Sequence, residues 1–220
     1  MKIIMCVAAF LATAAPPLFA QTERGYVAAS GGFAVSPDTT SGNALGEIGV
    51  RVAPHIVVFG DVGQFHDVQP SAVQPAIDAT TSFLSQSLGL NVTGTGRVPA
   101  LYSIGGIRYE LPRGTRLEPY VLGGIGVAHM SPTAEFSYAN GPLPDGSTPS
   151  VGDDVTSQIA TAGDFTLPAA TTAFMYTLGG GVGIPVTRKW IVDAGYRFSR
   201  INADTPLNVQ GVNFGVGYRF

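Results

Sequence analysis

The 220-residue chain contains little charge, a single cysteine and, beyond its first residues, no long apolar run. Charged side chains make up 12% of it, about half of the roughly 25% found in ordinary soluble domains. Its 12 lysines and arginines are outnumbered by 15 acidic residues, which excludes a strongly basic nucleic-acid-binding surface. No stretch in the body of the chain approaches the ~20 apolar residues that a membrane helix needs. An average cytoplasmic globule and a helical membrane protein are therefore both disfavoured.

The first twenty residues have the pattern of a secretory signal peptide. Lys2 precedes an apolar run from Ile3 to Ala12, and the small residue Ala20 stands directly before Gln21. We expect residues 1–20 to be removed, so that the mature chain comprises residues 21–220. An uncleaved anchor is the alternative, although the run is short for a spanning helix. Because the only cysteine lies in this segment, cleavage leaves no disulfide and no Cys-ligated metal site within one mature chain.

The mature chain alternates apolar with small or polar residues, which is the pattern of β-strands. In the last segment, Val212, Phe214, Val216, Tyr218 and Phe220 share one face, and small or polar residues occupy the other. Each segment is near the ~10 residues of a tilted membrane strand. The same alternation marks seven further segments, residues 26–35, 45–52, 56–65, 100–110, 118–129, 174–184 and 190–199.

The connections between these segments alternate in length. Residues 53–55, 111–116 and 185–189 are expected to be tight turns, and residues 36–43, 66–98, 130–170 and 202–209 to be loops, two of them very long. Short turns at one end and long loops at the other are typical of outer-membrane barrels. The sequence therefore predicts an all-β fold, an eight-stranded antiparallel transmembrane up-and-down β-barrel with long extracellular loops.

Charged residues within the segments lie on the polar face. A soluble, lipocalin-like barrel is the rival fold, but it needs charges on its outer face, where the last three segments carry mostly glycine, serine, threonine and asparagine. In a small barrel, side chains fill the lumen. We expect Asp193 to pair with Arg219, and neutralising one member of the network to destabilise the barrel and create a leak current. The predicted lumen charge network comprises Glu47, Arg51, Asp61, Arg108, Asp193, Arg197 and Arg219, with Glu47 and Arg51 reaching Asp61.

The C-terminal residues Gly215–Phe220, the eight short segments and the signal peptide together resemble the opacity-protein and outer-membrane-protein-A type of small β-barrel. The resemblance covers the whole mature chain. It implies a monomer in the lipid of a Gram-negative outer membrane, with Phe214, Tyr218 and Phe220 as the signal that the barrel-assembly machinery recognises. Related barrels serve as adhesins, tethers, narrow channels or enzymes, so the resemblance does not fix an activity.

Other residues that could carry chemistry favour structural interpretations. The glycine runs 123–126 and 179–183 lack the following helix that a phosphate-binding loop requires, and crowding inside a barrel explains them better. His55, His66 and His129 do not share a metal-ligand spacing. A hydrolase site built from His129, Ser131 and Glu135 is disfavoured. We therefore expect no enzymatic activity, no metal and no cofactor.

The long loops are the predicted seat of function, because binding residues concentrate on loops held by a rigid scaffold. Within residues 66–98, Pro75 begins a helical pattern that ends at Gly89, expected to form a short lid on the barrel mouth. Residues 130–170 suggest a hairpin above the membrane. Acidic residues dominate both loops, Asp67, Asp78, Asp145, Asp153, Asp154 and Asp164, with Arg97 nearly alone against them.

These acidic loops either attract divalent cations or form a solvated surface. We expect a structural or surface-interaction role, adhesin-like or opacity-like, through an extracellular partner of residues 66–98 and 130–170. A narrow channel for small or apolar solutes is the alternative function.

Overall fold

The computed structural model describes residues 24–112, 117–143, 146–147, 149–161 and 167–220. The expected signal peptide, part of the turn at residues 111–116, Asp145 and Asp164 lie outside these residues. Among the described residues, no helix is long and apolar enough to cross a membrane.

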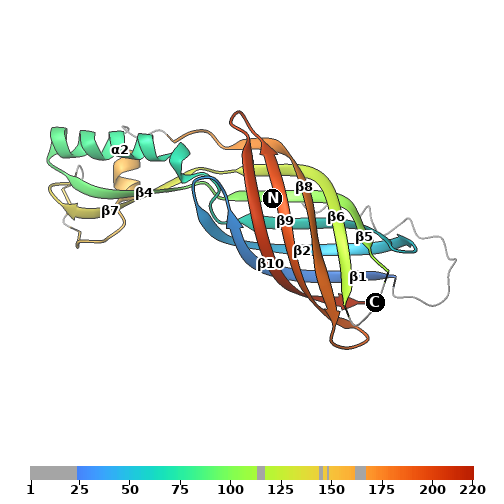
Figure 1. Cartoon of the computed structure of the whole chain (residues 1–220). Coiled ribbons are helices and arrows are strands. Elements are labelled where there is room, and N and C mark those ends of the chain that lie inside the picture. Colours follow the sequence, from blue (N-terminus) through green and yellow to red (C-terminus); the bar gives the residue numbers. More distant parts are fainter. Residues whose placement is uncertain (1–23, 113–116, 144–145, 148, 162–166) are drawn as a thin grey trace.

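Eight strands of the described chain close into an antiparallel barrel, in the order β1-β10-β9-β8-β6-β5-β3-β2 (Figure 1). Each strand pairs with its neighbours along the chain, apart from the two inserted segments described below, and β1 closes against β10. The predicted fold class is therefore confirmed. The barrel strands are β1 (Gly25–Val35), β2 (Thr40–Ala53), β3 (Ile56–Phe65), β5 (Ala100–Glu110), β6 (Glu118–Met130), β8 (Thr171–Pro185), β9 (Trp190–Asn202) and β10 (Leu207–Arg219).

Alternate residues of each strand face the lumen or the outside. Apolar side chains populate the outside, among them Phe33, Ile125, Leu178 and Phe214, each more than half exposed. In water this surface would be an aggregation hazard, whereas a bilayer solvates it. The outward orientation of the apolar face, which separates a membrane barrel from a lipocalin-like one, follows from this arrangement.

Two of the expected loops are shorter than predicted. Strand β2 begins at Thr40 and β10 at Leu207, so only residues 36–39 and 203–206 remain as connections there. The polar residues of these segments, such as Ser41 and Asn208, resemble loop sequence, but their backbone groups complete the β1–β2 and β9–β10 ladders. The tight turn at residues 53–55 is present, with His55 at a positive φ of 67°.

The two long insertions fold together into a compact unit beyond one end of the barrel (Figure 1). We call this unit the head, residues 70–97 and 133–161 as far as they are described. Strand β4 from the first insertion pairs with β7 from the second, and α2 packs on β4. Its elements are the 3-10 helix η1 (Pro70–Ala72), α2 (Gln74–Phe83), the π-helix η2 (Leu84–Leu88), β4 (Asn91–Arg97), β7 (Thr133–Asn140) and α3 (Thr156–Thr161).

The head corrects two predictions. The helix after Pro75 exists and ends at Gly89, which has φ 65°, but it packs on β4 instead of forming a lid on the barrel mouth. The expected hairpin within residues 130–170 is present only in part, because the main partner strand of β7 comes from the other insertion. Within its own insertion, β7 also pairs with residues 152–155, through the bridge between Ser137 and Asp154 and through backbone hydrogen bonds of Phe136 and Tyr138.

Candidate functional site

Five charged side chains from four strands meet in the middle of the lumen. The two arginines stand between the three carboxylates: Arg108 Nη1 lies 3.2 Å from Glu47 Oε1, and Arg108 Nη2 lies 3.1 Å from Asp193 Oδ2. Arg197 pairs with the other oxygen of Glu47 and with Asp61. Glu47 and Asp61 lie opposite each other in the β2–β3 register, so one arginine bridges both. This central network spans the lumen from β2 and β3 to β5 and β9.

Two tyrosines complete the central network. The Tyr26 hydroxyl donates to Glu47 Oε1, and the Tyr120 hydroxyl donates to Asp193 Oδ1 at 2.7 Å. The guanidinium carbon of Arg108 lies 3.4 Å from the centre of the Tyr120 ring, a cation–π geometry. Because a buried, unpaired charge costs several kcal/mol, this dense pairing is what permits so much charge inside the barrel.

The other two arginines of the predicted lumen set lie nearer the turn end and have partners that the sequence analysis missed. Arg51 Nη2 pairs with Glu110 Oε2 at 2.6 Å, and Arg219 pairs with Glu118. Both glutamates follow the same two-residue period as their neighbours, so the pattern contained the signal for them.

The expected pairings of Asp193 with Arg219 and of Arg51 with Asp61 are therefore wrong. Asp193 lies opposite Gly215, four residues along β10 from Arg219, and Asp61 lies opposite Glu47, four residues along β2 from Arg51. Four residues correspond to about 13 Å along a strand, beyond the reach of an ion pair.

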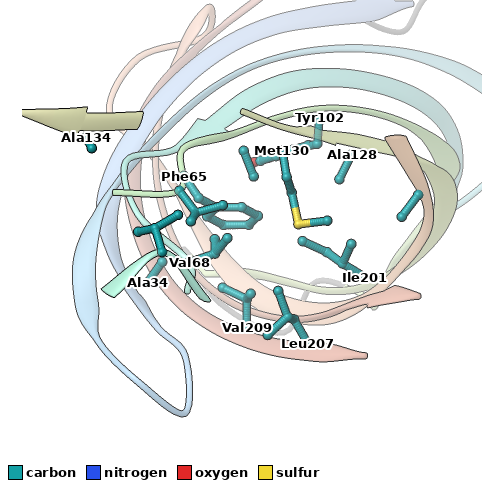
Figure 2. Packing of buried hydrophobic residues seen from close by; sticks show 14 of the residues in the cluster. Ala34, Phe65, Val68, Tyr102, Ala128, Met130, Ala134, Ile201, Leu207 and Val209 are labelled. Atoms are coloured by element: carbon teal, nitrogen blue, oxygen red, sulfur yellow. The ribbon is translucent and has the colours of Figure 1, made fainter. Parts of the chain in front are cut away.

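An apolar layer fills the lumen at the head end. Phe65, Val68, Met130, Ile201 and Leu207 converge there (Figure 2) and are all at most 7% exposed. Beneath this layer lie four buried polar residues without charge, Asn43, Thr177, Ser199 and Asn213. An ion crossing the barrel would thus meet a dry, hydrocarbon-like constriction before it reached the central network.

A cavity of about 50 Å³ lies between the central network and the turn end, lined in part by Arg51, Glu110 and Arg219. This volume holds a few water molecules at the ~15 Å³ that each requires. Crowding inside the barrel explains glycines of both runs, since a Cβ at Gly124 of β6 would stand 2.7 Å from Ile104 Cγ2. Gly181 lies in β8, where an added Cβ would stand 2.5 Å from the Tyr120 hydroxyl.

The surface of the head is acidic. Several aspartates accept local hydrogen bonds: at the base of the head, Asp67 accepts from the Val98 amide at 3.0 Å, and in the head, Asp153 accepts from the Ser150 amide at 2.8 Å. The Thr156 side chain and backbone amide hydrogen-bond Asp154 and lower the pKa of that carboxyl. Within the described ranges, no three His, Cys, Asp or Glu side chains are grouped so that they could hold a metal ion.

The residues of the disfavoured hydrolase site do not form a triad. His129 faces outward on β6, and its Nδ1 contacts Thr172 Oγ1 at 2.8 Å. Glu135 pairs with Arg97 in the head at 3.6 Å. The histidine is therefore engaged with a threonine of β8, and the acid with a basic residue of β4.

The predicted C-terminal residues lie at the barrel seam. Phe214 and Phe220 face outward, 59% and 57% exposed. The Phe220 amide donates to Gly25 O at 3.0 Å, and the Gly25 amide donates back at 3.1 Å. Tyr218 packs edge-on against Trp190, with ring centroids 5.2 Å apart, and these two aromatic rings mark the turn end of the apolar band.

Solved structures similar to this chain include three small outer-membrane barrels at 15% identity, and the first of them supports the fold alone. Neisserial surface protein A matches over 89% of this chain and 97% of its own with a TM-score of 0.54. The N-terminal β-barrel domain of Pseudomonas aeruginosa OprF covers 91% and 100% at 0.47. Ail, the attachment invasion locus protein of Yersinia pestis, covers 90% and 99% at 0.45 in its complex with a heparin analogue. No curated protein matches the chain by sequence.

The family model described as the outer membrane protein beta-barrel domain matches residues 5–220. That match and the closed eight-stranded barrel agree over the whole described chain. The chain therefore belongs to the outer-membrane β-barrel protein family, whose members lie in the bacterial outer membrane.

Proposed function

We propose that the protein is a non-enzymatic surface protein whose barrel anchors the head outside the cell, where the head binds an extracellular partner. The observation that carries this proposal is the joint folding of two insertions into one unit. Strand β4 aligns with β7 over seven residue pairs, from Asn91–Asn140 to Arg97–Thr133. A surface held in one conformation loses less conformational entropy on binding than two independent loops would.

Glycines of β4 let α2 lie directly on the head sheet. A Cβ at Gly94 would stand 2.2 Å from Ile77 Cγ2, and one at Gly96 would stand 2.3 Å from Val73 Cγ2. Ile77 and Phe136, at most 1% exposed, fill the space between helix and sheet. The head thus has a packed apolar interior, continuous with the apolar layer of the barrel, which supports a role as a rigid binding module.

The charge of the two insertions favours a neutral or cationic partner. Residues 66–98 and 130–170 contain seven acidic residues and one arginine, a difference of six negative charges by sequence. A polyanionic ligand would be repelled by this surface.

The lumen supports anchoring more than transport. The apolar layer and the central network lie in series, and each opposes the passage of ions. The narrow-channel alternative would require both to open. The contacts of His129 and Glu135 with residues outside a triad likewise favour a non-enzymatic protein.

Export and assembly are part of the same proposal. Residues 1–20 act as the secretion signal, and Phe214, Tyr218 and Phe220 are read by the barrel-assembly machinery as in the family that the sequence resembles. The mature protein is a monomer whose outer wall contacts lipid, a proposal supported by the closure of the described strands, each of which pairs with two neighbours in the barrel.

Adhesion of whole cells tests the proposal. A non-adherent Gram-negative strain would express either the wild-type protein or a headless variant, in which short Gly-Ser links replace residues 70–97 and 133–168. Wild-type cells should bind immobilised collagen, lysozyme or histone, proteins of neutral or positive charge, more strongly than headless cells. The variant G94V/G96V keeps both insertions but removes the space in which α2 packs on β4. It should therefore bind like the headless variant, which shows that the fold of the head, and not only its presence, is required.

The amount of each protein in the outer membrane is equalised by its heat-modifiable gel band, since closed barrels migrate differently before and after boiling. Equal adhesion of wild-type and headless cells to all three proteins would contradict the proposed function.

A further inference from the structure

The outer wall of the barrel carries one charged side chain among its described strand residues, Arg200 of β9. Its neighbours Ser199 and Ile201 are buried in the lumen, so Arg200 faces outward. Every other Asp, Glu, Lys or Arg of the described barrel strands faces the lumen, where each makes an ion pair. An arginine on the lipid-facing side is costly at the bilayer midplane, by about 2–4 kcal/mol, and nearly free of cost at the interface. The energetic cost of Arg200 therefore depends on its height along the barrel wall.

Arg200 lies above the aromatic pair at the turn end by about the full height of the apolar band of the membrane. Trp190 begins β9 and packs on Tyr218, and ten residues separate Trp190 from Arg200 (200 − 190). At about 3.3 Å per residue and a tilt of about 40°, ten residues rise by about 25 Å, the height of the apolar band of such barrels. Arg200 is thus at the level of the lipid headgroups on the head side.

Hydrogen-bond donors from both adjacent strands surround this arginine. The register places Tyr176 of β8 and Asn208 of β10 directly beside it. Asn208 accepts from Arg200 Nη1 through Oδ1 at 3.5 Å, which leaves its amide nitrogen to donate elsewhere. Gln210 accepts from the Tyr196 hydroxyl through Oε1 at 3.0 Å, with the same consequence for its own amide nitrogen.

No carboxylate of the described residues makes an ion pair with Arg200. This includes Asp204, the nearest acidic residue along the chain. One row across three strands thus presents the guanidinium of Arg200, the phenol of Tyr176 and the amide of Asn208. The amide of Gln210 lies two residues further along β10, toward the turn end. Under this row the wall is apolar, with Leu178 and Val212 57% and 45% exposed. A ligand that suits both parts has a phosphate group above and acyl chains below.

We propose that the outer face of β8, β9 and β10 binds the phosphate of an anionic lipid of the head-side leaflet, with Arg200 as its principal contact. We call this face the Arg200 site. The guanidinium and the amides of Asn208 and Gln210 donate to the phosphate oxygens, and the acyl chains lie over Leu178 and Val212. Inorganic phosphate has the same oxygens but no chains, so the apolar wall favours the lipid. This inference concerns the lipid-facing wall and does not rest on the function of the head.

Native mass spectrometry of the full-length protein in detergent micelles tests the site. The probes are phosphatidic acid and diacylglycerol with identical acyl chains, which differ only in the phosphate. The wild-type protein should retain phosphatidic acid in preference to diacylglycerol. R200Q should weaken that retention about tenfold, as expected for a lost charge-assisted hydrogen bond, and R200K should recover part of it.

The matched control is R97Q, which removes the same charge from the head and should retain phosphatidic acid like the wild type. Each variant is first shown to be folded by its heat-modifiable band. Equal retention by R200Q and R97Q would overturn the proposal. Displacement of phosphatidic acid by an equimolar amount of inorganic phosphate would also overturn it, because the site would then bind a phosphate ion and not a lipid.

Discussion

Large side chains in the lumen occupy the space that neighbouring glycines leave free. Tyr26 reaches Glu47 only because Gly49, its register partner on β2, has no side chain. A Cβ at Gly49 would stand 2.3 Å from Tyr26 Cε1. The glycine therefore stabilises the central network indirectly, by making room for the tyrosine that donates to Glu47.

We predict that G49A destabilises the barrel by about 1–3 kcal/mol, the usual cost of overpacking a filled interior. The measurement is the free energy of urea unfolding in detergent micelles. Gly46 provides the matched control, because it lies on the same strand and a Cβ there would meet nothing within 4 Å. G46A should change the stability by at most about 0.5 kcal/mol. The same loss for both variants would mean that backbone flexibility of β2, and not the space for Tyr26, determines the effect.

The sequence predicts the kind of residue in the lumen better than it predicts the contacts. Alternation alone indicates that Arg108 and Asp193 face inward. Their pairing across the lumen could not be predicted, because β5 and β9 are not neighbours in the barrel and the stagger of the strands decides which levels coincide. The apolar layer was missed for the same reason, since Phe65, Met130 and Ile201 come from strand ends far apart in the sequence.

At the scale of elements, the barrel strands were predictable and the head was not. A barrel strand carries its own signal, because its two faces meet different surroundings over about ten residues. Strand β4 contains two glycines and is seven residues long, so its sequence shows almost no alternation of apolar and polar residues. Its identity as a strand depends on β7, 36 residues or more away (133 − 97), and on the helix that covers it.

The seat of α2 on β4 provides a prediction for this element. In G96V, the new side chain would collide with Val73 and Ile77, so α2 should detach from the sheet while the barrel stays closed. We expect proteolysis within residues 66–99 to accelerate about tenfold, with an unchanged heat-modifiable band. T95V, at the neighbouring exposed position, should show wild-type proteolysis. Resistance of G96V to the protease would show that α2 does not need this glycine.

The last strand provides another prediction. F220A keeps the backbone bonds to Gly25 but removes the ring, and we expect it to lower the amount of protein in the outer membrane. Phe174 is the control for the loss of an outward-facing ring, because it is 51% exposed against 57% for Phe220. Membrane fractionation should show a much larger loss for F220A than for F174A. Similar losses would indicate that outward-facing aromatic area, and not an assembly signal, controls the amount inserted.

At the scale of the whole molecule, three zones follow one another along the barrel axis: the head, the apolar layer and the charged lumen. The head depends on the barrel for its position, because both insertions leave and re-enter strands at the same rim, β3–β5 and β6–β8. Val68 of the first insertion contributes to the apolar layer, so the base of the head and the closure of the lumen share residues (Figure 2).

This arrangement changes the expected effect of a single charge removal. D193N removes a charged hydrogen-bond partner of Arg108 and Tyr120, and it should lower the unfolding free energy by about 1–3 kcal/mol, because Arg108 keeps Glu47 as a carboxylate partner. The apolar layer is a separate barrier, however, because an ion must lose its hydration to pass it. D193N alone should therefore not conduct steadily, in contrast to what the charge pattern by itself suggests.

A steady leak should need both barriers to be breached, for example in D193N combined with Ile201→Ser. Ile201 is fully buried in the apolar layer, and a hydroxyl there admits water into the constriction. Single-channel recording in a planar bilayer distinguishes the cases: no steady current for the wild type, D193N or Ile201→Ser alone, and a current for the double variant. R97Q combined with Ile201→Ser is the control for a charge removed outside the lumen, and it should stay silent. Steady current through the wild type, unchanged in D193N, would instead favour the channel function, because neither barrier would then control the passage of ions.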